Sequence, residues 1–541
     1  MQSKIKRVIN LIRKHGIIGF AVKFQEKTSE PVNLVYKEQY HHFLPDEKEK
    51  EKERETAFSY LPKISLVVPA YCTKKEFLEE LIASVKAQTY ENWELCFADG
   101  SPADEVTALV KPYEKDERIR VIHLEHNYGI SGNTNEGFRA ATGDYIGLLD
   151  HDDVLAPNAL YEVVKVLNKF VYEEQSDEKH LVVSERMPLF FYSDEDKVSA
   201  DLSQHFEPHF KPDFNPELLN HYNYICHFVV FHRSLLEKAG MLNSDYDGAQ
   251  DYDFVLRCTE VVPEECIYHI PKILYHWRVH SLSTAGDSGS KDYAYEAGKL
   301  AVAAHLERIG CAAKVESVKG RETLAVSYDL PKIELEQKKD TLFGEEAEAE
   351  NAFIVKQGHG FVNPSKNWKQ KMMQYFQKEK VGMVCGKAIR GTKVYACGLT
   401  FDEKGNVMPL FKGLPSFFKG YYRRAVAPQN ISAGLLDFCM IEKKAYQEVG
   451  GIDKSLPTPY RDLDFAFRLR KAGYQVILDP TIRVVCSRME LPDEQEAKKA
   501  RQVLRERWND YLLEGDPFYN QNLALEPEKT YHLKDVTNSI K

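Results

Sequence analysis

The chain has 541 residues, too many for one ordinary hydrophobic core, so we expect two or three domains. Hydrophobic residues make up 43% and charged residues 28%, which is typical of globular rather than disordered or fibrous proteins. A net charge of −10 argues against nucleic acid as a partner. Ten cysteines without a Cys-x-x-Cys pair indicate neither a zinc site nor a disulfide framework, and they fit a reducing cytoplasm best.

Residues 1–62 form the first predicted segment, a basic amphipathic helix followed by a charged linker. The longest apolar run near its start, Gly16–Val22, is too short for a secretory signal, and no stretch reaches the roughly 20 residues that span a bilayer. Residues 4–27 alternate apolar and basic side chains. This pattern either rests on the cytoplasmic face of an anionic membrane or packs on the protein with its lysines in water. Asp46–Glu55 has alternating charges, typical of a solvated helix or linker.

From Lys63 onward the pattern alternates between strands and helices, which predicts a parallel, doubly wound sheet with right-handed crossovers. No Gly-x-Gly-x-x-Gly follows the first strand, so a dinucleotide-binding fold gets no support. The expected strands cover residues 64–69, 93–98, 119–124 and 145–149, and the expected helices cover residues 75–88, 105–115 and 132–141.

Three carboxylates, Asp150, Asp152 and Asp153, follow the fourth strand, at the edge where ligands of such sheets bind. Clustered carboxylates repel one another unless a cation or a donor network shares their charge. Oxygen ligands of this kind suit Mg²⁺ or Mn²⁺, which usually accompany a phosphate-bearing substrate. The alternative is an acidic turn that caps the next helix.

A looser pattern extends the domain to residues 63–330, with strands expected at 190–193, 225–231 and 267–277 and a helix at 250–260. An acidic linker at 331–350 then precedes a second copy at 351–490 and a C-terminal helix and tail at 491–541. Gln250–Arg257 recurs as Arg461–Arg468, and Gly240 precedes Asp251 by the same spacing as Gly451 precedes Asp462. The second copy has Lys356-Gln-Gly-His-Gly360 where an acidic cluster would fall, so we expect no metal-dependent active site there.

Five motifs occur in one order along the chain: Pro69-Ala-Tyr71, Asp99-Gly-Ser101, Asn127-Tyr-Gly-Ile-Ser131, Asp150-His-Asp-Asp153 and Gln250-Asp-Tyr-Asp253. In this order they resemble family-2 glycosyltransferases of GT-A fold, and more narrowly bacterial enzymes that build rhamnose-containing or other cell-surface polysaccharides. The resemblance covers roughly residues 63–310. It implies an α/β GT-A sheet followed by a second, degenerate GT-A-like domain.

The resemblance also implies an inverting transfer from a UDP- or dTDP-sugar to a hydroxyl of a polysaccharide or lipid-linked glycan. A divalent cation, Mg²⁺ or Mn²⁺, would offset the charge of the leaving diphosphate, and a carboxylate would act as general base. We expect Asp251 to be that base, since the family places its catalytic acid there; a first-turn acid favoured by the helix dipole is the alternative. Asp152 is expected to ligate the metal, Asp150 to hold the ribose or the metal's outer shell, and Asp153 to support them.

Arg278 and His280 follow a predicted strand and fall on one side of it. Arg278 is expected to clamp the diphosphate bidentately, with a surface ion pair as its alternative, and His280 to ligate the metal or a phosphate. Many relatives have two acids after the second strand, whereas here Ala98 precedes a single Asp99. The remaining donor-binding predictions are Pro69, Tyr71 stacking on the base, Asp99 accepting from a base N–H, Asn127, Ser131 and Asn135.

Two rival functions remain open at this stage. A retaining glycosidase also uses paired carboxylates, but it does not need a clustered metal site at a sheet edge. A catalytically silent scaffold or glycan-binding subunit of a polysaccharide assembly complex is the rival from another class. The acidic cluster and Asp251 argue against that reading for the N-terminal half, whereas it is the leading one for the C-terminal half.

Overall fold

The computed structural model describes residues 31–173, 181–280, 288–318, 323–331, 347–348, 353–488, 491–526 and 528–534. It divides the chain into two compact units. The first unit comprises Gln39–Asp329 with Pro517–Asn520, and the second comprises Met1–Glu38, Leu330–Asp516 and Gln521–Lys541. The amphipathic helix expected over residues 4–27 and most of the expected linker fall outside the described residues. Within the described ranges, no helix has both the length and the apolar character of a bilayer span.

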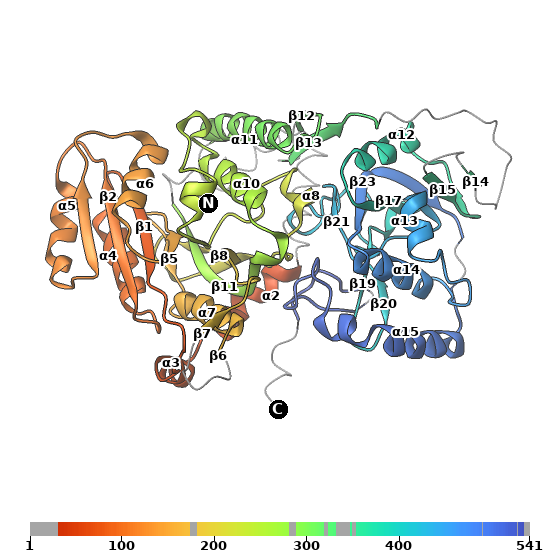
Figure 1. Cartoon of the computed structure of the whole chain (residues 1–541), viewed down its shortest axis with the longest axis horizontal. Coiled ribbons are helices and arrows are strands. Elements are labelled where there is room, and N and C mark those ends of the chain that lie inside the picture. The colour runs from red at the N-terminus through yellow and green to blue at the C-terminus, as the bar shows by residue number, and fades with distance from the viewer. Residues whose placement is uncertain are drawn as a thin grey trace, which may run out of the picture. The chain divides into compact units, whose positions relative to one another are not determined.

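The first unit is built on a nine-stranded sheet with the order β3-β2-β1-β4-β10-β8-β11-β5, and β9 pairs with β8 (Figure 1). β1 pairs in parallel with β2 and β4, and β2 with β3, as the alternating pattern predicted. β10 is antiparallel to both β4 and β8, so the complete sheet is mixed rather than parallel. The strands are β1 (Ile64–Ala70), β2 (Trp93–Asp99), β3 (Ile119–His123), β4 (Tyr145–Leu148), β5 (Val154–Leu155), β8 (Phe190–Ser199), β9 (His205–His209), β10 (Val229–His232) and β11 (Ile267–Val279).

Helices and shorter elements complete this unit. Two small two-stranded sheets accompany the main one, β6 (Val171–Glu173) with β7 (Leu181–Val183) and β12 (Ala313–Val318) with β13 (Thr323–Tyr328). The α-helices are α3 (Glu47–Arg54), α4 (Lys75–Lys86), α5 (Glu105–Val110), α6 (Gly129–Ala140), α7 (Ala159–Leu167), α8 (Pro216–Leu219), α9 (Leu235–Lys238), α10 (Gln250–Val261) and α11 (Ser288–Arg308). The charged run predicted as solvated is α3, which has a capping box between Asp46 and Glu49 and no buried residue.

The core follows from the alternation of apolar side chains along β1. Ile64, Leu66 and Val68 belong to one buried cluster, together with apolar residues of α4, α5 and α7. Val67 contributes to the packing of α6, where a Cβ on Gly137 would lie 2.4 Å from Val67 Cγ1. Only glycine therefore lets α6 approach the sheet this closely. These two layers place the carboxyl ends of β1, β2 and β4 at one edge of the sheet.

A short return of the chain completes the first unit. Asn520 Nδ2 donates to Asp194 Oδ2 and to the Lys211 carbonyl, both at 2.9 Å, and Asp213 N donates to the Pro517 carbonyl at 2.7 Å. Both Asp194 and Asn520 are buried. The amide of Asn520 thus joins the Lys211 backbone N–H and the His269 ring in satisfying this buried carboxylate.

The second unit repeats the later part of the first unit's sheet. Its sheet order is β14-β15-β22-β17-β23-β16, with β18 on β17 and β21 on β23. β22 is antiparallel to β15 and β17, and β23 is parallel to β17, the pattern that β10 makes with β4 and β8 and that β11 makes with β8. The strands are β14 (Ala347–Glu348), β15 (Phe353–Gln357), β16 (Phe361–Val362), β17 (Val381–Arg390), β18 (Lys393–Ala396), β21 (Gln429–Asn430), β22 (Phe438–Glu442) and β23 (Gln475–Cys486); β19 (Leu399–Phe401) and β20 (Val407–Pro409) pair separately, and the helices are α12 (Trp368–Met373), α13 (Lys443–Glu448), α14 (Tyr460–Lys471) and α15 (Glu494–Glu514).

Each unit contains an equivalent buried ion pair that holds a helix to the turn before it. In α10, Arg257 donates to Asp253 Oδ2 at 2.7 and 2.9 Å and to the Ala239 carbonyl. In α14, Arg468 donates to Asp464 Oδ2 at 2.8 and 3.0 Å and to the Val449 and Gly451 carbonyls. The recurring Asp–Arg pair therefore explains Asp253 and Asp464 as structural residues.

We expect Asp462 in α14 to make the second unit less stable as pH rises from about 4 to about 7. Burial raises its pKa from 3.8 to about 7, with Arg461 opposing and Asp437 adding to the shift, so the folded state keeps a proton that the unfolded chain releases in this window. Asp462→Asn should stabilise the unit on the order of a few kcal/mol near neutral pH, and not at about pH 4. Urea unfolding followed by tryptophan fluorescence tests this; an equal gain at both pH values would contradict it.

Candidate active site

The three carboxylates that follow β4 lie in very different surroundings. Asp153 is fully buried and receives the Tyr275 hydroxyl at 2.6 Å and the Arg278 backbone N–H at 2.7 Å. Burial raises the pKa of Asp153 well above its ordinary value, and the charges of Asp152 and Asp150 raise it further. Asp150 is half-exposed, and its backbone N–H donates to the same Tyr275 hydroxyl at 3.2 Å. β11 therefore holds the acidic loop from behind while Asp150 faces outward.

His227 lies next to the acidic loop. Its Nε2 is 3.8 Å from Asp150 Oδ2, and its ring stacks on Tyr275 with centroids 4.5 Å apart and planes 13° from parallel. One ligating atom each of Asp150, Asp153 and His227 lie within 4.8 Å of one another. The sequence gives no local sign of this neighbourhood, since His227 lies more than seventy positions from the acidic loop along the chain.

Buried Glu195 positions His227. Glu195 Oε2 accepts the His227 backbone N–H at 3.1 Å and the Lys211 ammonium at 3.1 Å. Although burial pushes the pKa of Glu195 upward, Lys211 and His209 outweigh it and bring the pKa to about 2. This anionic carboxylate fixes the backbone at His227. No feature of the sequence alone indicates this role of Glu195.

Asp152 and His280, both predicted as metal ligands, are brought together. His280 Nε2 lies 2.7 Å from Asp152 Oδ2, and both side chains are largely buried. The imidazole ring packs against Phe77, with centroids 4.9 Å apart.

Arg278 has a different position from the one predicted. Its guanidinium is fully buried; Nε donates to the Asp152 carbonyl at 2.6 Å, and Nη1 to the Ala200 carbonyl at 2.8 Å and to Glu80. Among the described residues, Nη2 alone of these three nitrogens has no hydrogen-bond partner. A bidentate clamp on diphosphate needs a free edge of the fork, whereas here two of the three nitrogens already hold the acidic loop and its neighbours. The sequence pattern placed Arg278 next to this strand, but it did not indicate that the guanidinium would be buried.

Asp251, the predicted base, begins α10 and lies in the neighbourhood of the acidic loop. Asn223 Nδ2 donates to Asp251 Oδ2 at 2.9 Å. Burial raises the pKa of Asp251, nearby His227 opposes the shift, and the charge of Asp150 adds to it. A raised pKa makes a carboxylate a stronger base, which is what removal of a proton from a hydroxyl requires.

The predicted donor-binding residues at the ends of β1 and β2 differ in exposure. Pro69 is half-buried and Tyr71 is 46% exposed, so the Tyr71 ring is accessible for stacking. Asp99 is fully buried and accepts from Ser101 N at 2.9 Å and from Thr107 N and Oγ1 at 3.0 and 2.7 Å. Burial would raise its pKa, but these hydrogen bonds and one from His123 lower it. Asp99 thus organises its own loop, and its use by a base N–H stays a prediction.

The predicted residues around α6 are mostly engaged with the protein. Asn127 is exposed, and its Oδ1 accepts from Gly129 N and Asn133 Nδ2, both at 2.9 Å. Ser131 is buried and donates to Asp247. Asn135 exchanges two hydrogen bonds with the backbone of Leu242, at 2.9 and 3.0 Å. Ser131 and Asn135 therefore fasten α6 to the loop before α10, and their donor-binding role stays a prediction.

The residues around the acidic loop fit a divalent cation. Among the described residues, no lysine or arginine side chain forms an ion pair with Asp150, Asp152 or Asp153, so their mutual repulsion is offset only by two imidazoles and by hydrogen bonds. Carboxylates suit Mg²⁺ and Mn²⁺, and imidazole favours the transition metal of the two. Two acid–imidazole pairs, Asp152 with His280 and Asp150 with His227, offer ligands to such an ion.

Comparison with known proteins assigns the first unit. Residues 65–240 match the family model for glycosyl transferase family 2. An uncharacterized protein, y4gI, of Sinorhizobium fredii is 32% identical over 554 residues, covering 86% of this chain and 58% of that protein. The O-antigen biosynthesis protein RfbC of Myxococcus xanthus is 34% identical over 258 residues, covering 47% of this chain and 19% of that protein. The chain thus spans little more than half of the first relative and about a fifth of the second.

A solved structure, Staphylococcus aureus TarS 1–349 in complex with UDP-GlcNAc, is 17% identical and has a TM-score of 0.35, with 45% of this chain and 66% of that chain covered. The match of residues 65–240 to glycosyl transferase family 2 confirms the family resemblance seen in the sequence, and the first unit has the mixed α/β sheet that the resemblance implies. Asp251, Arg278 and His280 lie beyond the matched segment.

We expect Tyr275→Phe to weaken binding of Mn²⁺ to the first unit by about tenfold or more. The substitution removes the hydroxyl that donates to Asp153 and accepts from Asp150 N, and such supporting partners typically contribute 10–100-fold in metal affinity. Calorimetric titration of the full chain measures the change. Tyr268→Phe is the matched control, because the Tyr268 ring packs on Phe170 and Phe191 away from the acidic loop. Equal affinity of the two variants would contradict the prediction.

Proposed function

We propose that the first unit transfers a sugar, with inversion, from a UDP- or dTDP-sugar to a hydroxyl of a growing cell-surface polysaccharide or lipid-linked glycan. The observation that carries the proposal is that Asn223, which donates to Asp251 Oδ2 at 2.9 Å, lies in one short loop with His227, whose Nε2 is 3.8 Å from Asp150 Oδ2. The candidate base for the acceptor thus lies near the acidic residues that would hold a diphosphate-bound cation. The relative named for O-antigen biosynthesis supports a polysaccharide product.

In this proposal each residue has a defined task. Asp251 accepts the proton of the acceptor hydroxyl, and Asn223 orients its carboxylate. Asp150, Asp152, His227 and His280 are the candidate ligands of Mg²⁺ or Mn²⁺, which when bound would stabilise the negative charge of the leaving nucleotide. Asp153, Tyr275 and Arg278 hold the acidic loop in shape. Tyr71, at the exposed end of β1, is the candidate for stacking on the base.

The second unit is proposed as a non-catalytic platform for the glycan or for assembly partners. The spacing that relates Asp251 to Asp462 places Phe438 at the position of His227, and Gly358-His359-Gly360 follow β15 where the acidic loop follows β4. Arg461 binds Asp437 at 2.7 Å and Asp462 at 3.3 Å. Arg461 thus pairs with the counterpart of the proposed base, while burial still raises the pKa of Asp462 to about 7.

Asp251→Asn is expected to lower turnover by about 10²–10⁴, the usual contribution of a general base, without weakening donor binding. Asp462→Asn, the same substitution at the repeated position, should leave turnover near that of the unmodified chain. The measurement is release of UDP or dTDP from a panel of nucleotide sugars, with and without a chelator. Normal turnover by Asp251→Asn would remove it as the base, and an equal loss in Asp462→Asn would refute the silent second unit.

We also propose that residues 1–30 attach the protein peripherally to the cytoplasmic face of a membrane, where a lipid-linked acceptor would lie. The support is the basic, amphipathic pattern of residues 4–27, since each basic residue contributes about 1 kcal/mol near an anionic surface. Deletion of residues 1–30 should release the protein from vesicles containing phosphatidylglycerol and leave its weak binding to phosphatidylcholine vesicles unchanged. Undiminished co-sedimentation with the anionic vesicles would reject the attachment.

A further inference from the structure

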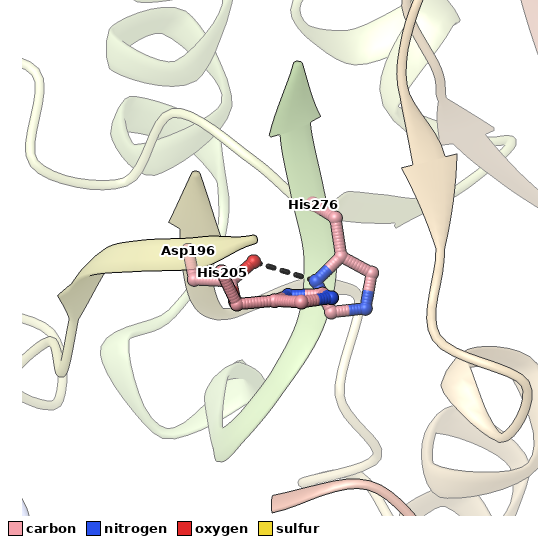
Figure 2. Close-up of side chains that lie close together, drawn as sticks. All are labelled: Asp196, His205 and His276. Atoms are coloured by element: carbon pink, nitrogen blue, oxygen red, sulfur yellow. Dashed lines mark hydrogen bonds and ion pairs between the residues drawn. The ribbon is translucent and has the colours of Figure 1, made fainter. Parts of the chain in front are cut away.

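A second cluster of metal-ligating side chains lies in the first unit, apart from the acidic loop. Asp196 of β8, His205 of β9 and His276 of β11 converge, as Figure 2 shows. Asp196 Oδ2 is 2.7 Å from His205 Nδ1, and Asp196 Oδ1 is 2.5 Å from His276 Nδ1. One ligating atom of each residue lies within 4.8 Å of the others. Asp196 and His276 are buried, and the His205 ring is covered by Tyr40, which stacks on it with centroids 4.2 Å apart.

This cluster lies on the face of β11 opposite His227. Tyr275 and Trp277 of β11 both contact the His227 ring, with centroids 4.5 and 6.1 Å away. Adjacent residues of a strand point to opposite faces, so His276 projects from the other face of β11. Asp196 is its direct cross-strand partner in the parallel pair of β8 with β11. The cluster therefore lies across β11 from His227 and shares no residue with the candidate ligands of the catalytic cation.

The second unit indicates that the fold itself does not need this polar cluster. In both units the parallel strand pair resumes after a register shift, and Asp196 with His276 is the second pair after that shift in the first unit. The second pair after the shift in the second unit is Ala388 with Val484, and both are buried. The same strand geometry is thus stabilised by apolar side chains, at no cost in desolvated charge. Packing alone therefore does not explain a carboxylate and two imidazoles at this position.

We propose that Asp196, His205 and His276 form a binding site for a transition-metal dication of the Zn²⁺ or Fe²⁺ class. Two imidazoles with one carboxylate are a ligand set that prefers such ions over Mg²⁺ or Ca²⁺. The ligands come from three neighbouring strands, so a bound ion cross-links β9, β8 and β11. Because β11 also contributes Tyr275 and Arg278 to the acidic loop, the ion would stiffen the strand from which the loop is held. The proposal stands independently of the sugar-transfer function.

The test uses the full chain carrying Asp152→Asn and His280→Gln, which removes two candidate ligands of the catalytic cation. After chelator treatment and dialysis, this background should still bind one equivalent of Zn²⁺ in competition with a chromophoric chelator. With Co²⁺ it should develop the visible absorption bands of a nitrogen-ligated site. Failure to bind Zn²⁺ and Co²⁺ stoichiometrically would overturn the proposal, and this arm needs no substitution within the cluster itself.

A second arm adds His205→Gln to that background. Zn²⁺ affinity should fall by roughly 100-fold or more, because a direct ligand contributes at least as much as its supporting residues. His305→Gln is the matched control: His305 is equally buried and also bonds a carboxylate, Glu260, at 2.7 Å, but it has no second imidazole beside it. Circular dichroism establishes that both variants are folded. Equal Zn²⁺ affinity in the two variants would overturn the proposal.

Discussion

The mutual repulsion of Asp150, Asp152 and Asp153 is the constraint around which the first unit is organised. Three carboxylates within one turn of chain can remain ionised only where the surroundings supply positive charge or donors. The structure provides hydrogen bonds to the buried Asp153 and imidazoles beside Asp150 and Asp152. An arginine also holds the loop by donating to a backbone carbonyl of the loop. β11 provides most of these contacts, and Glu195 fixes the histidine that completes them. A divalent cation is the component that this arrangement of charges still favours.

The second unit is informative because it keeps the same strand pairing while its chemistry differs. Its helix retains the Asp464–Arg468 pair, which matches Asp253–Arg257, so that ion pair belongs to the fold. The groups around Asp251 and the acidic loop differ in the repeat: Arg461 lies beside Asp462, Phe438 stands at the position of His227, and Gly358-His359-Gly360 follow β15. Comparison of the two units thus separates residues needed for folding from residues that serve a site, without recourse to any other protein.

Much of the fold could be predicted from the sequence, because apolar runs of strand length alternate with amphipathic helices through the first 150 residues. The reversal of β10 could not, since strand direction is set by connections that a local pattern does not record. The acidic loop and Asp251 were recognisable because each forms a compact motif. His227 and Glu195 were not, because their roles arise only when β8, β10 and β11 lie side by side. Arg278 was placed on the correct strand, but burial in the Glu80 contact removed the free edge that the predicted role required.

The return of Pro517–Asn520 to the first unit has a consequence for biosynthesis. β1 to β11 and α11 leave the ribosome long before residue 520 is added, yet Asp194 and the Lys211 carbonyl take hydrogen bonds from Asn520. Until then Asp194 has its partners within the first unit, the Lys211 backbone N–H and the His269 ring, but not the Asn520 amide that completes its hydrogen bonding. The order in which this chain matures is thus not simply the order in which it is synthesised.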